Sequence, residues 1–304
     1  MTGAAAPIDR RLGGILMLLG AMAILPLMDA IAKHLSATFP LLEITWARFF
    51  FHFLVLLPIL LARHRPAQLW PRRPALQILR GGLLMASTFC FFGGVSYMPL
   101  ADTLAIFFIS PLIVTLLAPA LLGEQVGLRR RTAVAVGFIG ALVIIRPGLT
   151  VFQPAALFGI GSGFIYALYS ITTRKLAGTA PPLVTAAYTA LFGAIGTSAV
   201  VPFVWRMPAP GELVLMVLMG VIAAVGHFLI VLAYRRAEAS LLSPLTYSEM
   251  IAMVAVGYAV FGDFPDFWTV VGIVILIGSG AYISIREHRT GRQTGSETDP
   301  PSPG

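Results

Sequence analysis

The amino-acid sequence predicts an all-α integral membrane protein in which ten transmembrane helices form two inverted repeats of five helices each. Three observations lead to this prediction. The 304 residues are 58% hydrophobic and only 11% charged, whereas soluble domains carry about 25% charged residues. Apolar runs of roughly 17–25 residues, long enough to cross the ~30 Å hydrocarbon core of a bilayer, recur along the chain. Finally, one helical hairpin occurs twice in the sequence.

The chain begins with a short leader, residues 1–11, which we expect to be cytoplasmic. A signal peptide is the competing interpretation, because a basic start precedes an apolar run. That run continues to Met28 and leads directly into a second span, which favours a retained first helix. The ten predicted spans are 12–34, 41–62, 75–98, 101–122, 132–146, 152–173, 182–205, 212–234, 239–261 and 267–285. Residues 287–304 are polar and rich in Gly, Pro, Ser and Thr, which predicts a disordered cytoplasmic tail.

The positions of Lys and Arg predict the orientation of the spans. With the N-terminus placed in the cytoplasm, 16 of the 21 basic residues fall in cytoplasmic segments, 3 fall outside and 2 lie within spans. This bias follows the positive-inside rule and predicts a multi-pass protein of the cell inner (plasma) membrane with both termini in the cytoplasm. The net charge of +8 is therefore a topology signal and does not indicate a nucleic-acid partner.

The repeated hairpin has the same order of features in both copies. An apolar helix is interrupted by a proline, Pro111 or Pro244, and is followed by a Gly-acid turn, Gly123-Glu124 or Gly262-Asp263. A glycine-containing apolar helix closes each copy. Because proline removes a backbone donor and loosens its helix, the two prolines are candidate hinges, and static kinks explain them equally well.

The duplication divides the chain into a first repeat at 12–148 and a second repeat at 149–286. Each repeat contains five spans, which is an odd number, so the second repeat must cross the membrane in the opposite sense. Inverted repeats of this kind are common in secondary transporters, which bind their substrate near the midplane where the repeats meet.

Several short sequence patches carry a family resemblance. They are Asp29-Ala30-Ile31-Ala32-Lys33, Trp46-Ala47-Arg48-Phe49, Leu79-Arg80-Gly81, Gly123-Glu124, Arg146-Pro147-Gly148, the segment from Pro244 to Asp263, and Trp268. With them the chain resembles the drug/metabolite transporter superfamily, whose members contain two EamA domains. The resemblance covers about residues 12–286. One departure is Asp263, where many members carry Glu.

The resemblance implies a secondary transporter that moves a small polar metabolite by alternating access, without a cofactor. The first span and the segment 247–287 are most similar to a branch that takes up riboflavin or S-adenosylmethionine. Export of amino acids or toxic metabolites is the alternative, because exporters share this architecture. A membrane enzyme is less favoured, since the sequence contains no H-E-x-x-H or G-x-S-x-G motif. We therefore expect no catalytic or metal-binding residues.

Ionisable groups inside hydrocarbon are costly and usually face a partner or a substrate. Asp29 and Lys33 are one turn apart, so they form either a structural ion pair or part of a gate. Arg48 lies near enough to the membrane centre to hold a carboxylate or phosphate of a substrate, or to pair with Asp29. Glu43, closer to the outer interface, is interpreted as a solvated vestibule residue or as a lock.

Two further charged residues are candidates for the cavity. Arg80 lies near the inner end of its span, where either an orientation toward the cytoplasm or a place in the cavity is consistent with the sequence. Glu249 lies ten residues into span nine, where an unpaired carboxylate would be neutral or matched by a cation. It is therefore a candidate for substrate recognition and for coupling to protons or another ion.

Three aromatic residues complete the predicted site. Trp46, Tyr166 and Tyr247 lie within spans, away from the interfacial belts where Trp and Tyr usually gather. Stacking on such rings suits a flavin or an adenine, although packing accounts for any single one of them. The expected partners are thus a small-molecule substrate and the lipid bilayer, for a protein that acts as a monomer or a homodimer.

Overall fold

The computed structural model of the protein describes residues 7–65, 69–123, 127–146, 154–176, 179–237, 242–279 and 282. Several sequence predictions fall outside the described residues. They concern most of the leader, Glu124, Pro147-Gly148 and the tail at 287–304.

The described chain is helical, with no strand among the residues that the structure describes, as the sequence predicts. The first half contains α1 (Pro7–Leu35), α2 (Leu41–Arg63), α4 (Pro74–Tyr97), α5 (Leu100–Phe107), α6 (Ser110–Leu122) and α7 (Leu128–Ile145). The second half contains α8 (Ala156–Lys175), α9 (Pro182–Ser198), η1 (Val201–Phe203), α10 (Pro210–Arg236), η2 (Ser243–Tyr247) and α12 (Ser248–Phe261). A last helix follows at Phe267–Ser279.

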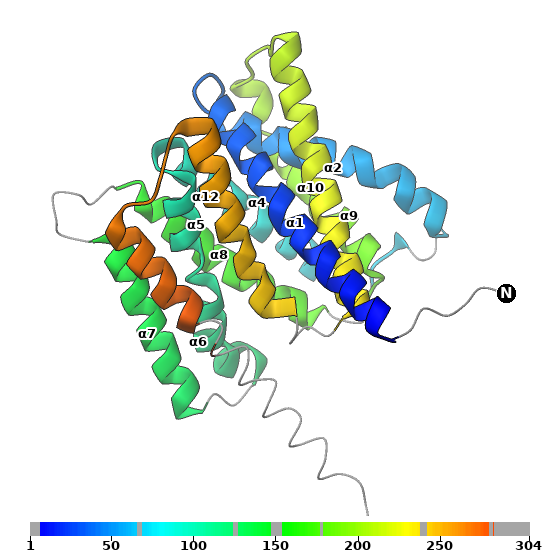
Figure 1. Cartoon of the computed structure of the whole chain (residues 1–304). Helices are drawn as coiled ribbons and strands as arrows, with labels where there is room; N and C mark the ends of the chain where they lie inside the picture. Colours follow the sequence, from blue (N-terminus) through cyan, green and yellow to red (C-terminus); the bar gives the residue numbers. More distant parts are fainter. Residues whose placement is uncertain are drawn as a thin grey trace, which may run out of the picture.

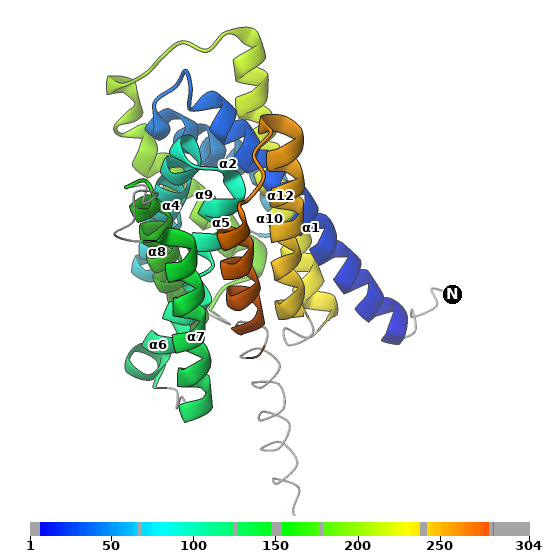
Figure 2. The same ribbon diagram turned by 60° about the vertical axis from the view of Figure 1, so that its left-hand side comes forward.

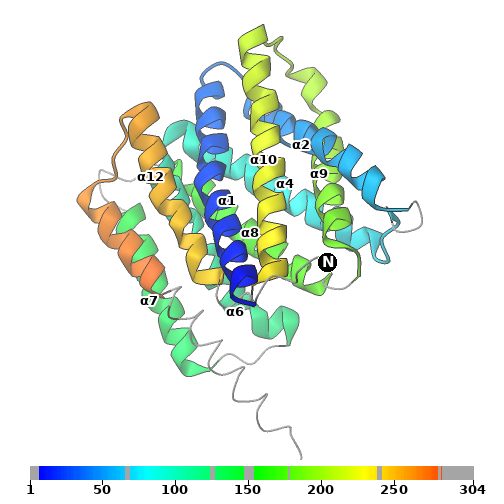
Figure 3. The ribbon, with the colours of Figure 1, turned by 45° about the vertical axis from the view of Figure 1, so that its right-hand side comes forward.

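These elements confirm the ten predicted spans. Within the described ranges, seven helices are long and apolar enough to cross a membrane, with α5 and α6 counted together. Three shorter apolar helices supply the remaining spans, Arg131–Ile145, Leu245–Phe261 and Phe267–Ser279. The figures show them as one bundle, with α1 (blue) beside α10 (yellow) (Figure 1, Figure 3).

Proline and glycine set many of the helix ends. Pro74, Pro182 and Pro210 occupy the first helical position of α4, α9 and α10, where the missing N–H has no intrahelical partner to lose. Gly123 and Gly262 end α6 and α12 with positive φ values of 70° and 72°, a left-handed conformation that costs glycine little. The two Gly-acid turns of the repeated hairpin therefore have the same backbone geometry at their glycines.

The packing of the helices reflects the inverted duplication. If the first and second halves are exchanged, α1 corresponds to α8, α2 to α9, α4 to α10, and α5 with α6 to η2 with α12. The most extensive contacts obey this exchange. Helix α1 packs on α10 as α8 packs on α4, α2 packs on α10 as α9 packs on α4, and α1 packs on α12 as α8 packs on α5 and α6. The two halves therefore interlock through equivalent faces.

Both fourth spans are discontinuous near their prolines. Helix α5 ends at Phe107 and α6 begins at Ser110, directly before Pro111. Because Pro111 has no N–H, the carbonyl of Phe107 lacks its usual helical donor. This carbonyl faces Gly163 of α8, where an added Cβ would lie only 2.9 Å from its oxygen. In the second half, Pro244 lies in the 3₁₀ turn η2, which leads into α12.

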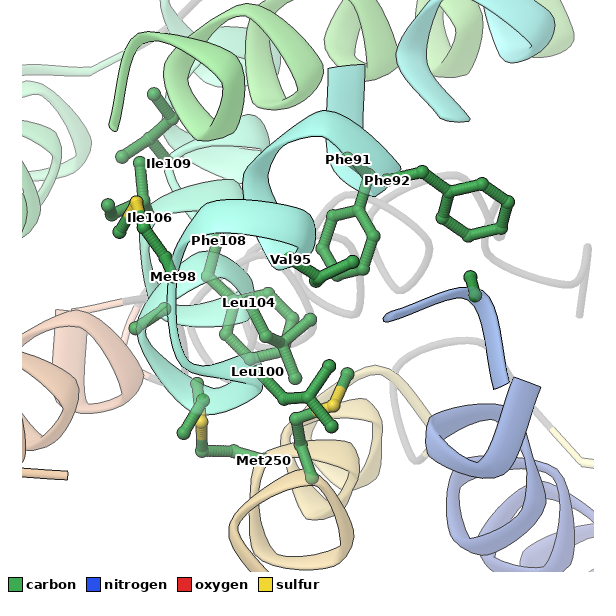
Figure 4. Packing of buried hydrophobic residues seen from close by; sticks show 14 of the residues in the cluster. Phe91, Phe92, Val95, Met98, Leu100, Leu104, Ile106, Phe108, Ile109 and Met250 are labelled. Carbon is green, nitrogen blue, oxygen red and sulfur yellow. The ribbon is translucent and has the colours of Figure 1, made fainter. Parts of the chain in front are cut away.

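A large hydrophobic cluster fills the end of the bundle that the sequence predicts to be outer. It includes Leu35 and Phe39 after α1, Ile44 of α2, and Met98 and Leu100 between α4 and α5, all buried. Figure 4 shows the packing of α4 and α5 within this cluster, where aromatic and branched side chains interdigitate. The same cluster also continues along α6 and α7 as far as Ala133 and Val134, and smaller clusters lie between individual helices toward the opposite end.

The fifth spans of the two halves lie against each other. Helix α7 (green) runs beside the last helix (orange to red) in two views (Figure 1, Figure 2). A Cβ added at Gly140 would lie 3.0 Å from the carbonyl of Gly272, and one added at Gly272 would lie 2.7 Å from the carbonyl of Gly140. The two glycines therefore allow the backbones to approach closely.

Candidate functional site

A cavity of about 350 Å³ lies between the two halves of the protein. Helices α1, α2, α4, α5 and α6 of the first half and α8, α10, η2 and α12 of the second contribute to its walls. Its polar lining residues are Asp29, Arg48, Ser87, Thr88, Ser110, Ser162, Tyr166, His227, Tyr234, Thr246 and Glu249. The cavity therefore combines both signs of charge with hydroxyl groups and aromatic rings.

The cavity extends toward one end of the bundle. Tyr234, which lies two residues before the end of α10, lines it and is 43% exposed. Phe92 and Leu104 line the opposite side and belong to the buried hydrophobic cluster. The cavity thus reaches the Arg236 end, which the sequence predicts to be cytoplasmic, and is closed toward the Lys33 end.

Arg48 is the basic residue among the lining side chains, and it is buried, at 4% exposure. One face of its guanidinium lies over the ring of Phe49, 4.5 Å from the centroid. Its Nε and Nη1 atoms are buried without any hydrogen-bond partner. Each such group inside a protein is costly unless something else satisfies it. Arg48 therefore lines the cavity, as the sequence predicts, and it has hydrogen-bond donors that the protein does not use.

Asp29 and Glu249 supply two carboxylates to the same cavity. Asp29 interacts electrostatically with Arg48, and Glu249 interacts with Asp29. Neither carboxylate forms an ion pair within 4 Å of a cation among the described residues. Of the two alternatives for Asp29 and Lys33, the structural ion pair is wrong, because Lys33 pairs with Asp263 instead.

Each discontinuous span delivers the start of an α-helix to the cavity. Ser110 and Pro111 begin α6, and Thr246 and Glu249 flank the start of α12; all four line the cavity. Glu249 lies in the first turn of α12, which differs from the predicted position ten residues into a continuous helix. Discontinuous helices whose ends face a central site are a recurrent feature of secondary transporters.

Several polar residues of the cavity were not among the site residues predicted from the sequence. Ser87 of α4 and Ser162 of α8 bond reciprocally, each hydroxyl donating to the other's backbone carbonyl at 3.0 and 2.9 Å. His227 lines the cavity, and its Nδ1 lies 2.8 Å from the carbonyl of Ala223. Isolated serines in apolar helices are common, so only their juxtaposition across the two halves distinguishes this pair.

Arg80 lies outside the lining of this cavity, contrary to the expectation from the sequence. Its Nε donates to Thr173 at 2.7 Å, Nη2 donates to Tyr169 at 2.7 Å, and Nη1 donates to the Thr185 carbonyl at 3.0 Å and to Thr189. These partners lie on α8 and α9. Because its donors are used within the protein, Arg80 joins α4 to these two helices.

Trp46 and Tyr247 are also placed differently from the prediction. Trp46 borders a separate surface pocket with Trp205, and its Nε1 donates to Ser198 at 2.9 Å. Tyr247 packs edge-on against Phe108, which does line the main cavity. Of the three predicted aromatics only Tyr166 lines the cavity, where it packs against Phe107 at a centroid distance of 4.9 Å.

Glu43 is buried, so the predicted solvated vestibule residue is a wrong interpretation. Its exposed fraction is 0%, and its Oε2 accepts a hydrogen bond of 3.0 Å from the backbone amide of Arg206. Arg206 in turn donates from Nη1 to the carbonyl of Thr38 at 2.7 Å. Glu43 therefore fixes the segment before α10 to the start of α2.

Lys33 belongs to an outer charge cluster, which we define as Lys33, Asp102, Arg146, Asp263 and Asp266. Lys33 Nζ lies 2.6 Å from Asp263 Oδ2, and Arg146 Nη2 lies 2.5 Å from Asp266 Oδ2. Asp102 interacts electrostatically with all four other members. Both ion pairs join a residue of the first half to a residue of the second, so the cluster links the two halves at the end where the cavity is closed.

Within the described ranges, no group of three or more His, Cys, Asp or Glu side chains could hold a metal ion. The charged groups of the cavity come from different helices of the two halves. This arrangement suits the binding of a polar molecule between two units that move relative to each other.

Comparisons with known proteins agree with this architecture. An S-adenosylmethionine uptake transporter of Rickettsia prowazekii (strain Madrid E) is 28% identical over 279 residues, covering 92% of this chain and 95% of the relative. A riboflavin transporter of Vibrio cholerae serotype O1 is 28% identical over 294 residues, covering 93% and 96%. The pseudopaline exporter CntI of Pseudomonas aeruginosa is 26% identical over 275 residues, covering 89% and 95%.

A solved crystal structure shares the fold. It aligns with a TM-score of 0.65 at 20% identity and covers 91% of this chain and 98% of its own. The model of the EamA-like transporter family matches the sequence twice, at residues 12–146 and 153–285. Each match spans one half of the interlocked bundle, with its five predicted spans. The protein is therefore a multi-pass membrane transporter rather than an enzyme, and it belongs to the EamA-like transporter family.

Proposed function

We propose that this protein is a secondary transporter that moves a small polar metabolite, of the riboflavin or S-adenosylmethionine type, across a bacterial inner membrane by alternating access. One observation carries the proposal. A cavity with unpaired charged groups lies between the two halves and is closed at one end by apolar packing and ion pairs. The uptake transporters to which the chain is similar along most of its length support the choice of substrate class.

The proposed orientation assigns the closed end to the outside. The excess of Lys and Arg in the segments predicted to be cytoplasmic supports both termini inside, since translocation disfavours basic loops. In this orientation the structure is an inward-facing state. Opening to the outside then requires the halves, proposed as residues 12–148 and 149–286, to separate at the outer charge cluster and to close around Tyr234.

Transport by purified protein tests the proposal directly. The protein is reconstituted into liposomes preloaded with unlabelled S-adenosylmethionine or riboflavin. The labelled compound is then added outside, and its accumulation inside the liposomes is followed over time. We expect counterflow of at least one compound above the level of protein-free liposomes. If neither compound exchanges, whichever direction the protein inserts, the proposed substrate class is wrong.

Coupling to protons is proposed for Glu249. This carboxylate faces Asp29 from α1 and Tyr166 from α8, and the cavity also contains Arg48 and His227. A carboxylate in such a site can exchange a proton between the two open states. In vesicles with an imposed pH gradient, Glu249→Gln is expected to exchange substrate but not to accumulate it. Gradient-driven accumulation by this variant would remove Glu249 from the coupling step.

Export is the second candidate, and one observation favours it. The pseudopaline exporter CntI covers 89% of this chain at 26% identity. Uptake and export differ in the direction of net flux, which the same fold can support. Cells that express the protein and contain labelled substrate distinguish the two, because an exporter lowers the cellular content and an importer raises it.

A further inference from the structure

The main cavity contains three charged groups that lack the partners which other charges of the bundle possess. Arg80 is bonded to α8 and α9, and Lys33 and Arg146 are in ion pairs. By contrast, Arg48 has two unsatisfied buried nitrogens. Asp29, at 5% exposure, is in no ion pair among the residues that the structure describes. Burial of unpaired charges is costly, so a bound molecule that supplies their partners would be favoured.

The basic side of the cavity is formed by α2 and α10. Arg48 lies one turn before His52 on α2, and the ring of His52 lies 5.3 Å from that of His227 on α10. His52 is buried behind this wall without lining the cavity, so Arg48 and His227 are the basic side chains that a ligand can contact. A carboxylate can accept two parallel hydrogen bonds from a guanidinium. This side therefore offers recognition of an anionic group.

The acidic side is formed by α1 and α12, which pack against each other. Asp29 and Glu249 are close enough to interact electrostatically, and both line the cavity. Two carboxylates without a cation between them repel each other, and a cationic group placed between them removes this repulsion. The acidic side therefore complements the basic one, and Asp29 also interacts electrostatically with Arg48.

We infer that the cavity recognises a zwitterion, with the anionic group held by Arg48 and the cationic group held between Asp29 and Glu249. The inference rests on the proposed function and narrows its substrate class, because it excludes uncharged molecules as the preferred ligand. The ring or apolar body of the ligand lies against Tyr166 and Phe107, which line the cavity and pack edge-to-face with an interplanar angle of 61°. Residues of both halves thus contact one ligand.

Ligand binding by the full-length protein in detergent tests this inference by calorimetry. The probes differ in which charged groups they carry. S-adenosylmethionine carries a carboxylate, an amine and a sulfonium; its decarboxylated form lacks the carboxylate; methylthioadenosine lacks all three groups; riboflavin is an uncharged ring. We expect S-adenosylmethionine to bind at least tenfold more tightly than each of the other three.

Substitutions at three residues assign the charges to their sides of the cavity. Arg48→Gln should abolish the preference for S-adenosylmethionine over its decarboxylated form, and Arg48→Lys should restore part of it. Asp29→Asn and Glu249→Gln should each lower affinity for S-adenosylmethionine about tenfold and should leave affinity for methylthioadenosine unchanged. Arg63→Gln, on the exposed end of the same helix α2, is the matched control and should bind like the unaltered protein.

The outcomes separate this inference from the proposed function. Tight binding of riboflavin with no preference among the charged probes would overturn the zwitterion site and leave a metabolite transporter. If Arg48→Gln is monodisperse and folded but loses affinity for all probes equally, Arg48 has a structural role. That result would also overturn the zwitterion site. Binding of none of the four compounds, together with absence of counterflow, would overturn both the inference and the proposed substrate class.

Discussion

The outer charge cluster and the cavity use the same kinds of side chain in opposite ways. In the outer cluster, Lys33 and Arg146 each contact a carboxylate of the other half directly. In the cavity, Arg48, Asp29 and Glu249 come from three different helices and make no direct ion pair with one another in the described structure. Paired charges stabilise the conformation that contains them, whereas unpaired charges store an electrostatic cost that a ligand can remove. The comparison therefore separates residues that set the conformational state from residues that bind.

The largest effect is expected from a change in the cavity. Arg48→Gln should weaken binding or transport of a carboxylate-containing substrate about 10- to 100-fold, since hydrogen bonds to a charged group contribute roughly 1.5–3 kcal/mol. The apparent Tm of the ligand-free protein should stay unchanged or rise, because an unsatisfied buried charge has been removed. Calorimetry and thermal unfolding of the same preparation measure both quantities. A large fall in Tm without ligand would instead group Arg48 with the paired charges.

The second prediction concerns the backbone contact that positions the basic side. A Cβ at Gly220 of α10 would lie 2.8 Å from the backbone nitrogen of His52, so α10 and α2 must separate if Gly220 becomes Ala. Such overpacking costs about 1–3 kcal/mol. We expect Gly220→Ala to lower the apparent Tm and to weaken ligand binding together. Gly82→Ala on α4, where a Cβ meets nothing within 4 Å, is the control, and an equal loss of stability in it would contradict the explanation.

The third prediction breaks the outer cluster. Lys33→Gln removes the ion pair with Asp263 and a 3.1 Å hydrogen bond to the Met98 carbonyl. Because the side chains are 17% and 31% exposed, the loss of stability should be at most about 1 kcal/mol. Ligand affinity should change little, while labelling of cavity residues from the outer side should increase. The charge-exchanged variant Lys33→Asp/Asp263→Lys should restore the original labelling if the ion pair itself holds the outer end closed.

The smallest effect is expected for Asp266, which lies between α12 and the last helix. Its burial acts to raise its pKa, but hydrogen bonds from the Thr269 amide and from Arg146 lower it below the ordinary value of 3.8. The folded protein then binds the proton less readily than the unfolded protein. The ionised Asp266 therefore stabilises the folded state fully at pH values above that ordinary pKa. This stabilisation is lost as the pH falls through the lowered pKa. Asp266→Asn should lower stability by a few tenths of a kcal/mol at neutral pH, since the carboxylate is 51% exposed.

A pH series of thermal unfolding measures this last effect. The difference between Asp266→Asn and the unaltered protein should disappear in strong acid, where the carboxylate is protonated in both states. A difference that persists there would show that the side chain acts through packing rather than through charge. The same series on Lys33→Gln and on the double variant Lys33→Gln/Asp266→Asn shows whether the two ion pairs of the outer cluster act independently, since independent losses add.

Hydrophobicity and repetition in the sequence were sufficient to predict the membrane fold. Apolar runs have to become helices in a bilayer, because each backbone group must be satisfied within its own segment. The prolines that interrupt the repeated hairpins and the glycines at their turns were correctly identified, because the backbone limits of these residues are local. Arg48, Asp29, Glu249 and Tyr166 were found because charges and hydroxyl groups inside hydrocarbon need a partner.

The partner of each polar group was decided only by the tertiary structure. Lys33 is four residues from Asp29 yet pairs with Asp263, 230 residues away, because the packing of α1 on α12 brings the two halves together. Arg80 satisfies its donors on α8 and α9, and Glu43 accepts the amide of Arg206. The sequence determined which groups cannot remain unsatisfied in a membrane; only the contacts between helices from different halves determined which groups are satisfied by the protein and which remain available to a ligand.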